Sequence, residues 1–336
     1  MRKIIVLTVT LGVFAFLMIL SPSGYAASLP AEKAGKIGVP LGKIAYISNG
    51  DVWVMNWDGS NQFKAVTVEN ANGKISWAPD GKRFVFTRQG KVDVRSPNNL
   101  GGIHKVYDIF IGYIDSAMAK NTNFWYQVTS EMGGRNPEWM ADGSGILFTQ
   151  DINANKVNAE LPNYQTAIVD TMGSEIKFFR KDRLKTDIGV LMASPGPNNQ
   201  MVAVLFKGIN QVGMAVLPMN KESIAPGEIG TSIRIQKAAT APAWSPDGKW
   251  IAYIDTDMSR QGIYITTPDF KEQYLVYKPT VGRNLQTYPL SWSPDSKWIT
   301  FATTDGVIWI IDITGGGLKQ LTGTGMNMAP AWSKNK

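Results

Sequence analysis

One short pattern recurs along the chain and constrains the fold more than any other feature. A tryptophan precedes a Ser/Ala-Pro-Asp-Gly/Ser turn and then a segment of alternating apolar residues. Proline and glycine fix the backbone angles that a tight turn needs, so each copy predicts two antiparallel strands joined by that turn. Recognisable copies begin at Trp77, Trp139, Trp244, Trp292 and Trp332. A sixth, worn copy is expected near Ala193, and the intervals between copies suit one four-stranded blade each.

The two ends of the repeat array complement each other. The chain stops soon after Trp332, so the last copy lacks everything after its first strand. Three strands are predicted before the first copy, at 43–47, 52–55 and 63–67. Together with the segment ending at Trp332 they complete one blade, which closes a ring and leaves no open blade edge at either end. The sequence therefore predicts an all-β, six-bladed β-propeller of four-stranded antiparallel blades over residues 43–336.

The N-terminus has the order of an export signal. Arg2 and Lys3 precede an uncharged stretch at 4–20, which is followed by helix-breaking residues and a small-residue site at 24–27. This order predicts a signal peptide at 1–26, with cleavage after Ala26. An uncleaved membrane anchor is the alternative, because the apolar stretch is close to the minimum that spans a bilayer. We expect residues 27–42 to form a linker and the protein to be periplasmic or secreted.

The composition excludes several kinds of chemistry. The chain has no Cys and one His, so it cannot hold a Cys-ligated zinc, a thiolate nucleophile or a cage of several histidines. Asp255-x-Asp257-x-Ser259 faintly resembles a calcium loop, but Arg260 and Thr266 replace the glycine and glutamate that such a loop requires. His104 falls in a long insert, expected to be a loop, without a neighbouring acid or nucleophile. We therefore predict no catalytic residue, no metal ion and no cofactor.

The repeats resemble those of the TolB β-propeller family. The resemblance rests on W-S-P-D-G-K-x-I-A-Y at 244–253 and on D-x-T-G-G-G-L-K-Q-L-T at 312–322, and it extends over roughly 43–334. It implies the same six-bladed propeller, in a chain that we expect to lack the α/β domain that precedes the propeller in TolB. Similar propellers also accompany peptidase domains and form some polysaccharide lyases, so the resemblance specifies the fold better than the function.

A repeated Gly-Arg-Asn suggests a binding surface. It occurs at 134–136 and 282–284, each time just before a repeat. The chain there runs from an outer strand to the channel mouth of the next blade, so these residues are expected on one face, around the channel. Arginine at such a rim suits an acidic partner, although ordinary loop solvation remains the alternative. The predicted partner-binding residues are Arg135, Asn136, Arg283, Asn284 and Asn327.

Two further observations bear on function. A basic run at 177–185 is predicted on an outer strand, where charges either prevent strand addition or form an anionic docking patch. Glu138 is the only acidic residue in a Pro-x-Trp triplet, which disfavours a catalytic carboxylate pair in the channel.

The sequence as a whole favours an exported, non-catalytic propeller that acts as a scaffold or accessory subunit by binding an envelope or extracellular protein with acidic groups. We expect no nucleic acid partner, and membrane contact only through a retained signal. The alternative is an extracellular hydrolase or lyase that acts on polysaccharide or peptide through the channel.

Overall fold

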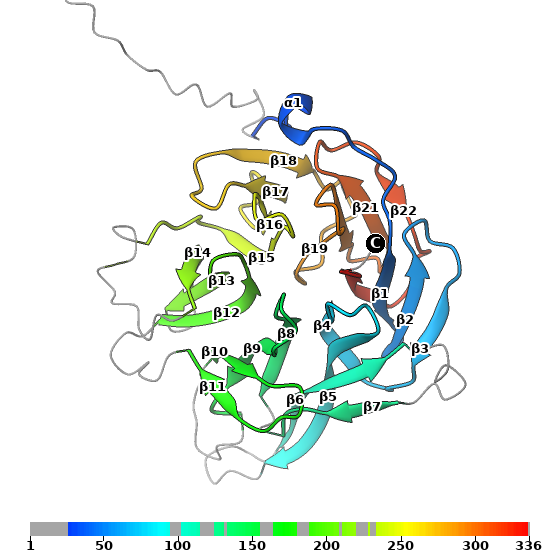
Figure 1. Cartoon of the computed structure of the whole chain (residues 1–336), viewed down its shortest axis with the longest axis vertical. Helices are drawn as coiled ribbons and strands as arrows, with labels where there is room; N and C mark the ends of the chain where they lie inside the picture. Colours follow the sequence, from blue (N-terminus) through cyan, green and yellow to red (C-terminus); the bar gives the residue numbers. More distant parts are fainter. Residues whose placement is uncertain are drawn as a thin grey trace, which may run out of the picture.

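Six antiparallel sheets surround a central channel in the computed structural model (Figure 1). It describes residues 26–94, 102–114, 124–130, 133–154, 164–179, 188–207, 210–219, 228 and 233–334. The predicted signal peptide lies outside the described residues, apart from Ala26. The sheets radiate from the channel as the blades of a propeller, which confirms the predicted fold class.

The strands of each blade follow one another from the channel outward. Blade 1 contains β23 (Asn327–Trp332), β1 (Lys43–Ser48), β2 (Asp51–Asn56) and β3 (Phe63–Val66). Blade 2 contains β4 (Ala71–Trp77), β5 (Arg83–Val94), β6 (Gly102–Tyr113) and β7 (Trp125–Gln127). Blade 3 contains β8 (Gly134–Trp139), β9 (Ile146–Asp151), β10 (Tyr164–Val169) and β11 (Ile176–Phe178). Blade 4 contains β12 (Ile188–Pro195), β13 (Gln200–Lys207) and β14 (Asn210–Pro218). Blade 5 contains β15 (Ala239–Trp244), β16 (Ile251–Asp255), β17 (Gly262–Thr266) and β18 (Gln273–Tyr277). Blade 6 contains β19 (Ser291–Trp292), β20 (Trp298–Ala302), β21 (Ile308–Asp312) and β22 (Lys319–Gln320).

The ring closes through blade 1, as the sequence predicts. The C-terminal strand β23 pairs antiparallel with the N-terminal strand β1, and Trp332 lies opposite Ile44. Both side chains are buried in a cluster that blades 1 and 6 share. The two ends of the chain are therefore joined by strand pairing and by a common apolar core.

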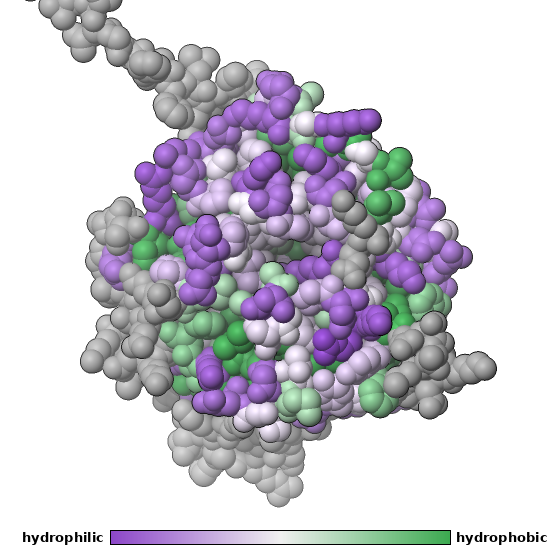
Figure 2. Space-filling model, in the orientation of Figure 1, coloured by the Kyte–Doolittle hydropathy of each residue, from purple (hydrophilic) through white to green (hydrophobic). Residues whose placement is uncertain are grey.

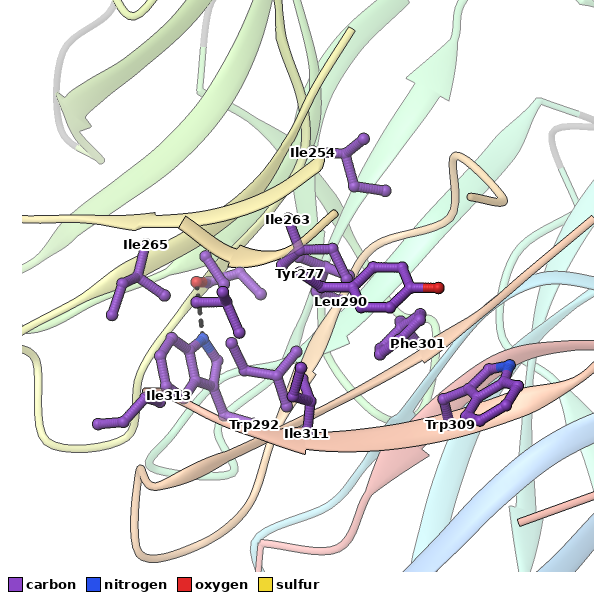
Figure 3. Close-up of a cluster of buried hydrophobic side chains, with 14 of the residues drawn as sticks. Ile254, Ile263, Ile265, Tyr277, Leu290, Trp292, Phe301, Trp309, Ile311 and Ile313 are labelled. Carbon is purple, nitrogen blue, oxygen red and sulfur yellow. Dashed lines mark hydrogen bonds between the residues drawn. The ribbon is translucent and has the colours of Figure 1, made fainter. Parts of the chain in front are cut away.

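The repeat tryptophans pack between neighbouring blades. Trp292 of blade 6 lies among apolar residues of blades 5 and 6, and its indole Nε1–H donates to the carbonyl of Ala243 in blade 5 at 3.0 Å (Figure 3). Trp77 of blade 2 donates in the same way to Ala331 of blade 1, also at 3.0 Å. Each of these side chains thus connects its own inner strand to the inner strand of the preceding blade.

Serine hydroxyls link the inner strands at the remaining tryptophan-bearing boundaries. Ser76, Ser194 and Ser291 each accept a hydrogen bond from the backbone N–H of the tryptophan in the next blade. These bonds join equivalent positions of adjacent strands, so the inner strands run side by side at one level. Their N-terminal ends therefore meet on one face of the propeller.

Blade 4 departs from the pattern in two ways. Its described part has three strands, and an isolated bridge between Met214 and Gln236 continues the sheet beyond β14. The predicted alignment of Ala193 with the repeat tryptophans is wrong, because Pro195 pairs with Met201 just as Trp244 pairs with Ile251. No tryptophan occupies that position in blade 4.

Residues 27–42, expected to be a linker, pack against the propeller, and we call them the strap. Leu29 and Ala34, the latter in the short helix α1 (Ala31–Ala34), are buried against blades 5 and 6. The carbonyl of Ala27 accepts from the backbone N–H of Leu275 at 3.0 Å. Further along, the carbonyl of Leu41 accepts from Trp332 Nε1 at 2.7 Å. The strap therefore extends from the outer strand of blade 5 to the closure of blade 1.

The described parts of the insert, 89–94 and 102–106, form paired strands, where a loop was expected. Strands β5 and β6 pair continuously from Arg83–Tyr113 to Val94–Gly102, and His104 pairs with Val92 in this ladder. Among the described residues, no helix is long and apolar enough to cross a membrane.

Candidate binding rim at the channel mouth

The N-terminal ends of the inner strands form the mouth of the channel on one face, which we call the rim. A bulge recurs there three residues before the tryptophan position, where Asn136, Met192, Ala241 and Ala329 all have left-handed backbone angles with φ between 50° and 54°. Asn136 tolerates this conformation better than most residues do, because asparagine visits the left-handed region readily. The predicted site residue Asn136 thus has a local backbone role.

Arg135 is the most constrained of the predicted rim residues. Its guanidinium carbon lies 3.9 Å from the centroid of the Tyr107 ring, and its side chain is half-buried. Its Nε is buried and has no hydrogen-bond partner within the described part of the chain. A positive charge held in place by ring stacking suits an acidic acceptor such as a carboxylate.

Hydrogen bonds connect this arginine site with the far side of the mouth. The Tyr107 hydroxyl donates to Gln89 Oε1 at 3.3 Å, and the same oxygen accepts from Asn72 Nδ2 at 3.4 Å. The hydroxyl of Tyr288, on the segment that leads into blade 6, donates to Asn72 Oδ1 at 3.3 Å. Tyr288 therefore reaches from blade 6, past blade 1, to blade 2.

Two tyrosines at the rim, Tyr164 and Tyr288, have raised pKa values and so stay protonated at neutral pH. Burial raises the pKa of Tyr164, while the nearby positive charge of Arg135 acts in the opposite direction. Burial also raises the pKa of Tyr288. Neutral phenols keep a donor at the tip and an apolar ring below it, which is the composition found at the centres of protein interfaces.

The other three predicted residues gather around the turn that joins β20 to β21. The carbonyl of Asn284 accepts from the backbone N–H of Thr304 at 2.8 Å. The side-chain amide of Asn327 donates to the carbonyl of Gly306, also at 2.8 Å. Arg283 is exposed, lies 3.7 Å from Asp305 and stacks 5.3 Å from the centroid of Trp309. The five predicted residues thus share one face but form two groups.

Three exposed apolar side chains lie on the same face as the second group. Met258 lies in the β16–β17 turn, Val281 precedes Arg283, and Met326 precedes Asn327. They are 85%, 105% and 66% exposed, respectively. Exposed methionines beside arginines and tyrosines are typical of surfaces that bind other proteins.

Inside the channel one carboxylate is shared by two ammonium groups. Among the described residues that line this cavity, the charged ones are Lys74, Glu138 and Lys334. The Glu138 carboxylate forms a buried ion pair with Lys74, and its other oxygen lies 3.8 Å from Lys334 Nζ. Ser194 donates to that oxygen at 3.4 Å. The arrangement is one carboxylate between two ammonium groups, which is unlike the pair of carboxylates that glycosidic hydrolysis needs.

The weak calcium-loop pattern is an ion-pair cluster. Arg260 lies 3.2 Å from Asp255 and 3.8 Å from Asp257. Burial raises the pKa of the Asp255 carboxyl, which also accepts from the backbone N–H of Asp257. The described residues contain no group of three or more His, Cys, Asp or Glu side chains arranged to hold a metal ion. Arg260 supplies the positive charge at this turn.

The sequence did not identify several residues of the mouth. Tyr107 falls in the insert that was expected to be a loop, and only its pairing opposite Gln89 brings it to Arg135. Lys74 is part of a wider bulge, in which three residues of β4 lie opposite Thr87. Tyr288 depends on a contact with Asn72 that spans more than two hundred residues of chain.

Comparisons with known proteins support the fold. No family model and no curated protein matches the chain. TolB from Acinetobacter baumannii aligns with a TM-score of 0.63 and 17% identity over 87% of this chain and 66% of its own. A putative TolB from Agrobacterium tumefaciens aligns with a TM-score of 0.57 and 11% identity over 87% of this chain and 92% of its own. A puromycin-hydrolyzing peptidase from Mycobacterium tuberculosis aligns with a TM-score of 0.52 and 10% identity over 89% of this chain and 45% of its own. The chain has a TolB-like six-bladed propeller fold and spans just under two thirds of the Acinetobacter protein.

Proposed function

We propose that this protein is an exported, non-catalytic propeller that binds another protein through the rim. The observation that carries the proposal is the Arg135 site. A half-buried guanidinium lies on the Tyr107 ring beside a hydrogen-bonded row of polar side chains. Such a site offers a fixed positive charge and an aromatic ring at one place, which suits an acidic side chain of a partner protein.

The second group extends this surface. Arg283 with its exposed apolar neighbours supplies a further positive charge and contact area on the same face. Its contact with Asp305 is long, at 3.7 Å, so a partner carboxylate can compete for the guanidinium. The partner that fits best is an envelope or extracellular protein whose docking surface carries acidic groups.

The channel supports a binding role better than an enzymatic one. Its carboxylate, Glu138, pairs with Lys74 and lies near Lys334. The described lining residues include no second carboxylate that could act with it as a catalytic pair. The TolB propellers among the structural neighbours agree with a periplasmic binding function. The export signal predicted at 1–26 agrees with the same compartment.

Site-specific photocrosslinking tests this proposal. A photoreactive phenylalanine analogue replaces Tyr107 at the rim or, as a matched control, Phe63 on the outer strand β3, where the side chain is 39% exposed. Crosslinking takes place in the cells that produce the protein. We expect an adduct with one protein from position 107, none from position 63, and loss of the adduct with Arg135→Ala. Equal adducts from both positions, or none from position 107, would show that the rim is not the interface.

A further inference from the structure

A second exposed surface lies on the opposite face of the propeller, where the inner strands end. We call it the back-face patch. It combines apolar side chains of the strap with those of two strand-joining turns of blades 1 and 6. Figure 2 shows a hydrophobic area over the segment that joins α1 to β1 and beside β22. The patch consists of Val39, Leu41, Trp57, Trp298 and Leu318, with the cations Lys36, Lys43 and Lys319.

Direct contacts hold the members of the patch together. Trp298 Nε1 donates to the carbonyl of Gly38 at 3.1 Å, which fixes the strap next to Val39. A Cβ at Gly317 would lie 2.6 Å from the Trp298 ring, so the turn that carries Leu318 touches the same indole. The Lys319 ammonium lies 5.1 Å from the centroid of the Trp57 ring. The strap, blade 6 and blade 1 thus form one continuous surface.

The apolar side chains of the patch protrude into solvent. Val39 is 69% exposed, Leu41 52% and Leu318 47%. The two indoles behind them are partly buried. Apolar tips in front of tryptophans, with lysines beside them, have the composition of surfaces that insert at the boundary between lipid headgroups and acyl chains.

Lysines outnumber acidic residues around the tips. The segment 35–43 carries Lys36 and Lys43 and no acidic residue, and the segment 316–320 carries Lys319 and no acidic residue. Hydrogen bonds from Ser60 and the charge of Lys319 lower the pKa of the nearby Asp58 carboxyl, so one negative charge accompanies the three lysines. Each exposed lysine close to an anionic membrane adds favourable electrostatic energy, which salt weakens.

We propose that the back-face patch docks on an anionic phospholipid membrane. Val39, Leu41 and Leu318 enter the interface, and the three lysines lie against lipid phosphates. The strap that carries two of these residues directly follows the predicted signal peptide, so export brings this part of the chain to the membrane before cleavage. The patch would add a second membrane contact to that of the signal segment. The rim, on the opposite face, would then point away from the lipid, towards a partner protein.

Vesicle binding of the full chain tests the proposal. Vesicles of phosphatidylcholine with about 30% phosphatidylglycerol are compared with pure phosphatidylcholine, at low and high salt. The variant Val39→Asp/Leu41→Asp/Leu318→Asp removes the three tips. The control variant Met258→Asp/Val281→Asp/Met326→Asp makes the same chemical change at three rim positions that are at least as exposed. We expect the patch variant to bind the anionic vesicles about tenfold or more weakly, and the control variant to bind as the unchanged protein does.

Hydrogen exchange of vesicle-bound protein separates the patch from the predicted signal peptide at 1–26, because it reports on each segment of the chain by itself. Peptides covering 36–43 and 316–320 should exchange several-fold more slowly when anionic vesicles are present, and the rim peptides should not change. Equal binding of both triple variants, or unchanged exchange in those two segments on bound protein, would overturn the proposal. If these two segments were protected from exchange without lipid, and the protection increased with protein concentration, the patch would be assigned to a second copy of the chain instead.

Discussion

Replacing Trp332 by alanine tests how the ring is closed. Trp332 is 2% exposed and packs with Ile44 and with residues of blade 6. Its indole donates to the Leu41 carbonyl at 2.7 Å, so one side chain holds together the C-terminal strand, the N-terminal strand and the strap.

The magnitude follows from burial. Truncation of a buried tryptophan to alanine costs about 3–5 kcal/mol, through lost apolar burial and the cavity that remains. The carbonyl of Leu41 lies on an exposed segment and can bond to water after the change, so the lost hydrogen bond adds about 1 kcal/mol at most. We expect Trp332→Ala to lower the free energy of unfolding by about 4 kcal/mol.

Urea unfolding followed by far-ultraviolet circular dichroism measures the effect, since tryptophan fluorescence would itself change. Trp57→Ala is the control, because Trp57 is only partly buried, at a turn of blade 1, and we expect it to cost about 1 kcal/mol. A loss below about 1 kcal/mol for Trp332→Ala, or equal losses for the two variants, would refute closure through β23.

Three further changes should have distinct outcomes. The hydrogen bond from Lys33 lowers the pKa of Glu272 below its usual value of 4.5, so the contribution of this pair is present above that pH and is lost as the pH falls through the folded-state pKa. The exchange protection factor at Leu275, whose N–H bonds to the strap, should therefore fall on acidification once the intrinsic exchange rate is divided out, and Lys33→Ala should remove that dependence. In the channel, Glu138→Ala leaves two ammonium groups without their counter-charge and should cost about 3–5 kcal/mol in urea unfolding, while adding Lys74→Ala should cost less than the sum of the single changes. Because Arg260 occupies the Asp255–Asp257 turn, neither calcium nor a chelator should move the unfolding midpoint, and a stabilisation by calcium would contradict this assignment.

The sequence predicted those parts of the fold that repeat. Each Pro-Asp-Gly turn fixes its own geometry, and each tryptophan is large enough to dominate an inter-blade contact, as Trp77 and Trp292 show. Closure could be predicted because the missing strands of the last repeat occur at the N-terminus. Blade 4 was misaligned because its motif lost the tryptophan, and strand pairing alone identifies Pro195.

The candidate site was predictable only in part. The Gly-Arg-Asn repeat placed Arg135 and Arg283 on one face, because every inner strand runs in the same direction. The partners of these arginines come from elsewhere in the chain. Tyr107 belongs to a hairpin insertion, and Tyr288 belongs to an irregular segment without a repeating pattern. The packing of the strap was not predicted, because it depends on isolated apolar residues such as Leu29 and Ala34 and not on a repeating pattern.

Binding of an acidic partner protein at the rim requires both arginines. The partner that photocrosslinking identifies, purified without the crosslink, is titrated against the Arg135→Ala/Arg283→Ala variant. The matched control is Lys177→Ala/Lys249→Ala, which removes two exposed cations away from the rim. We predict that the rim variant binds about 30-fold more weakly or worse, that the control binds as the unchanged protein does, and that both keep the original unfolding midpoint. Equal affinities of the rim variant and the unchanged protein would show that the partner does not bind at the rim.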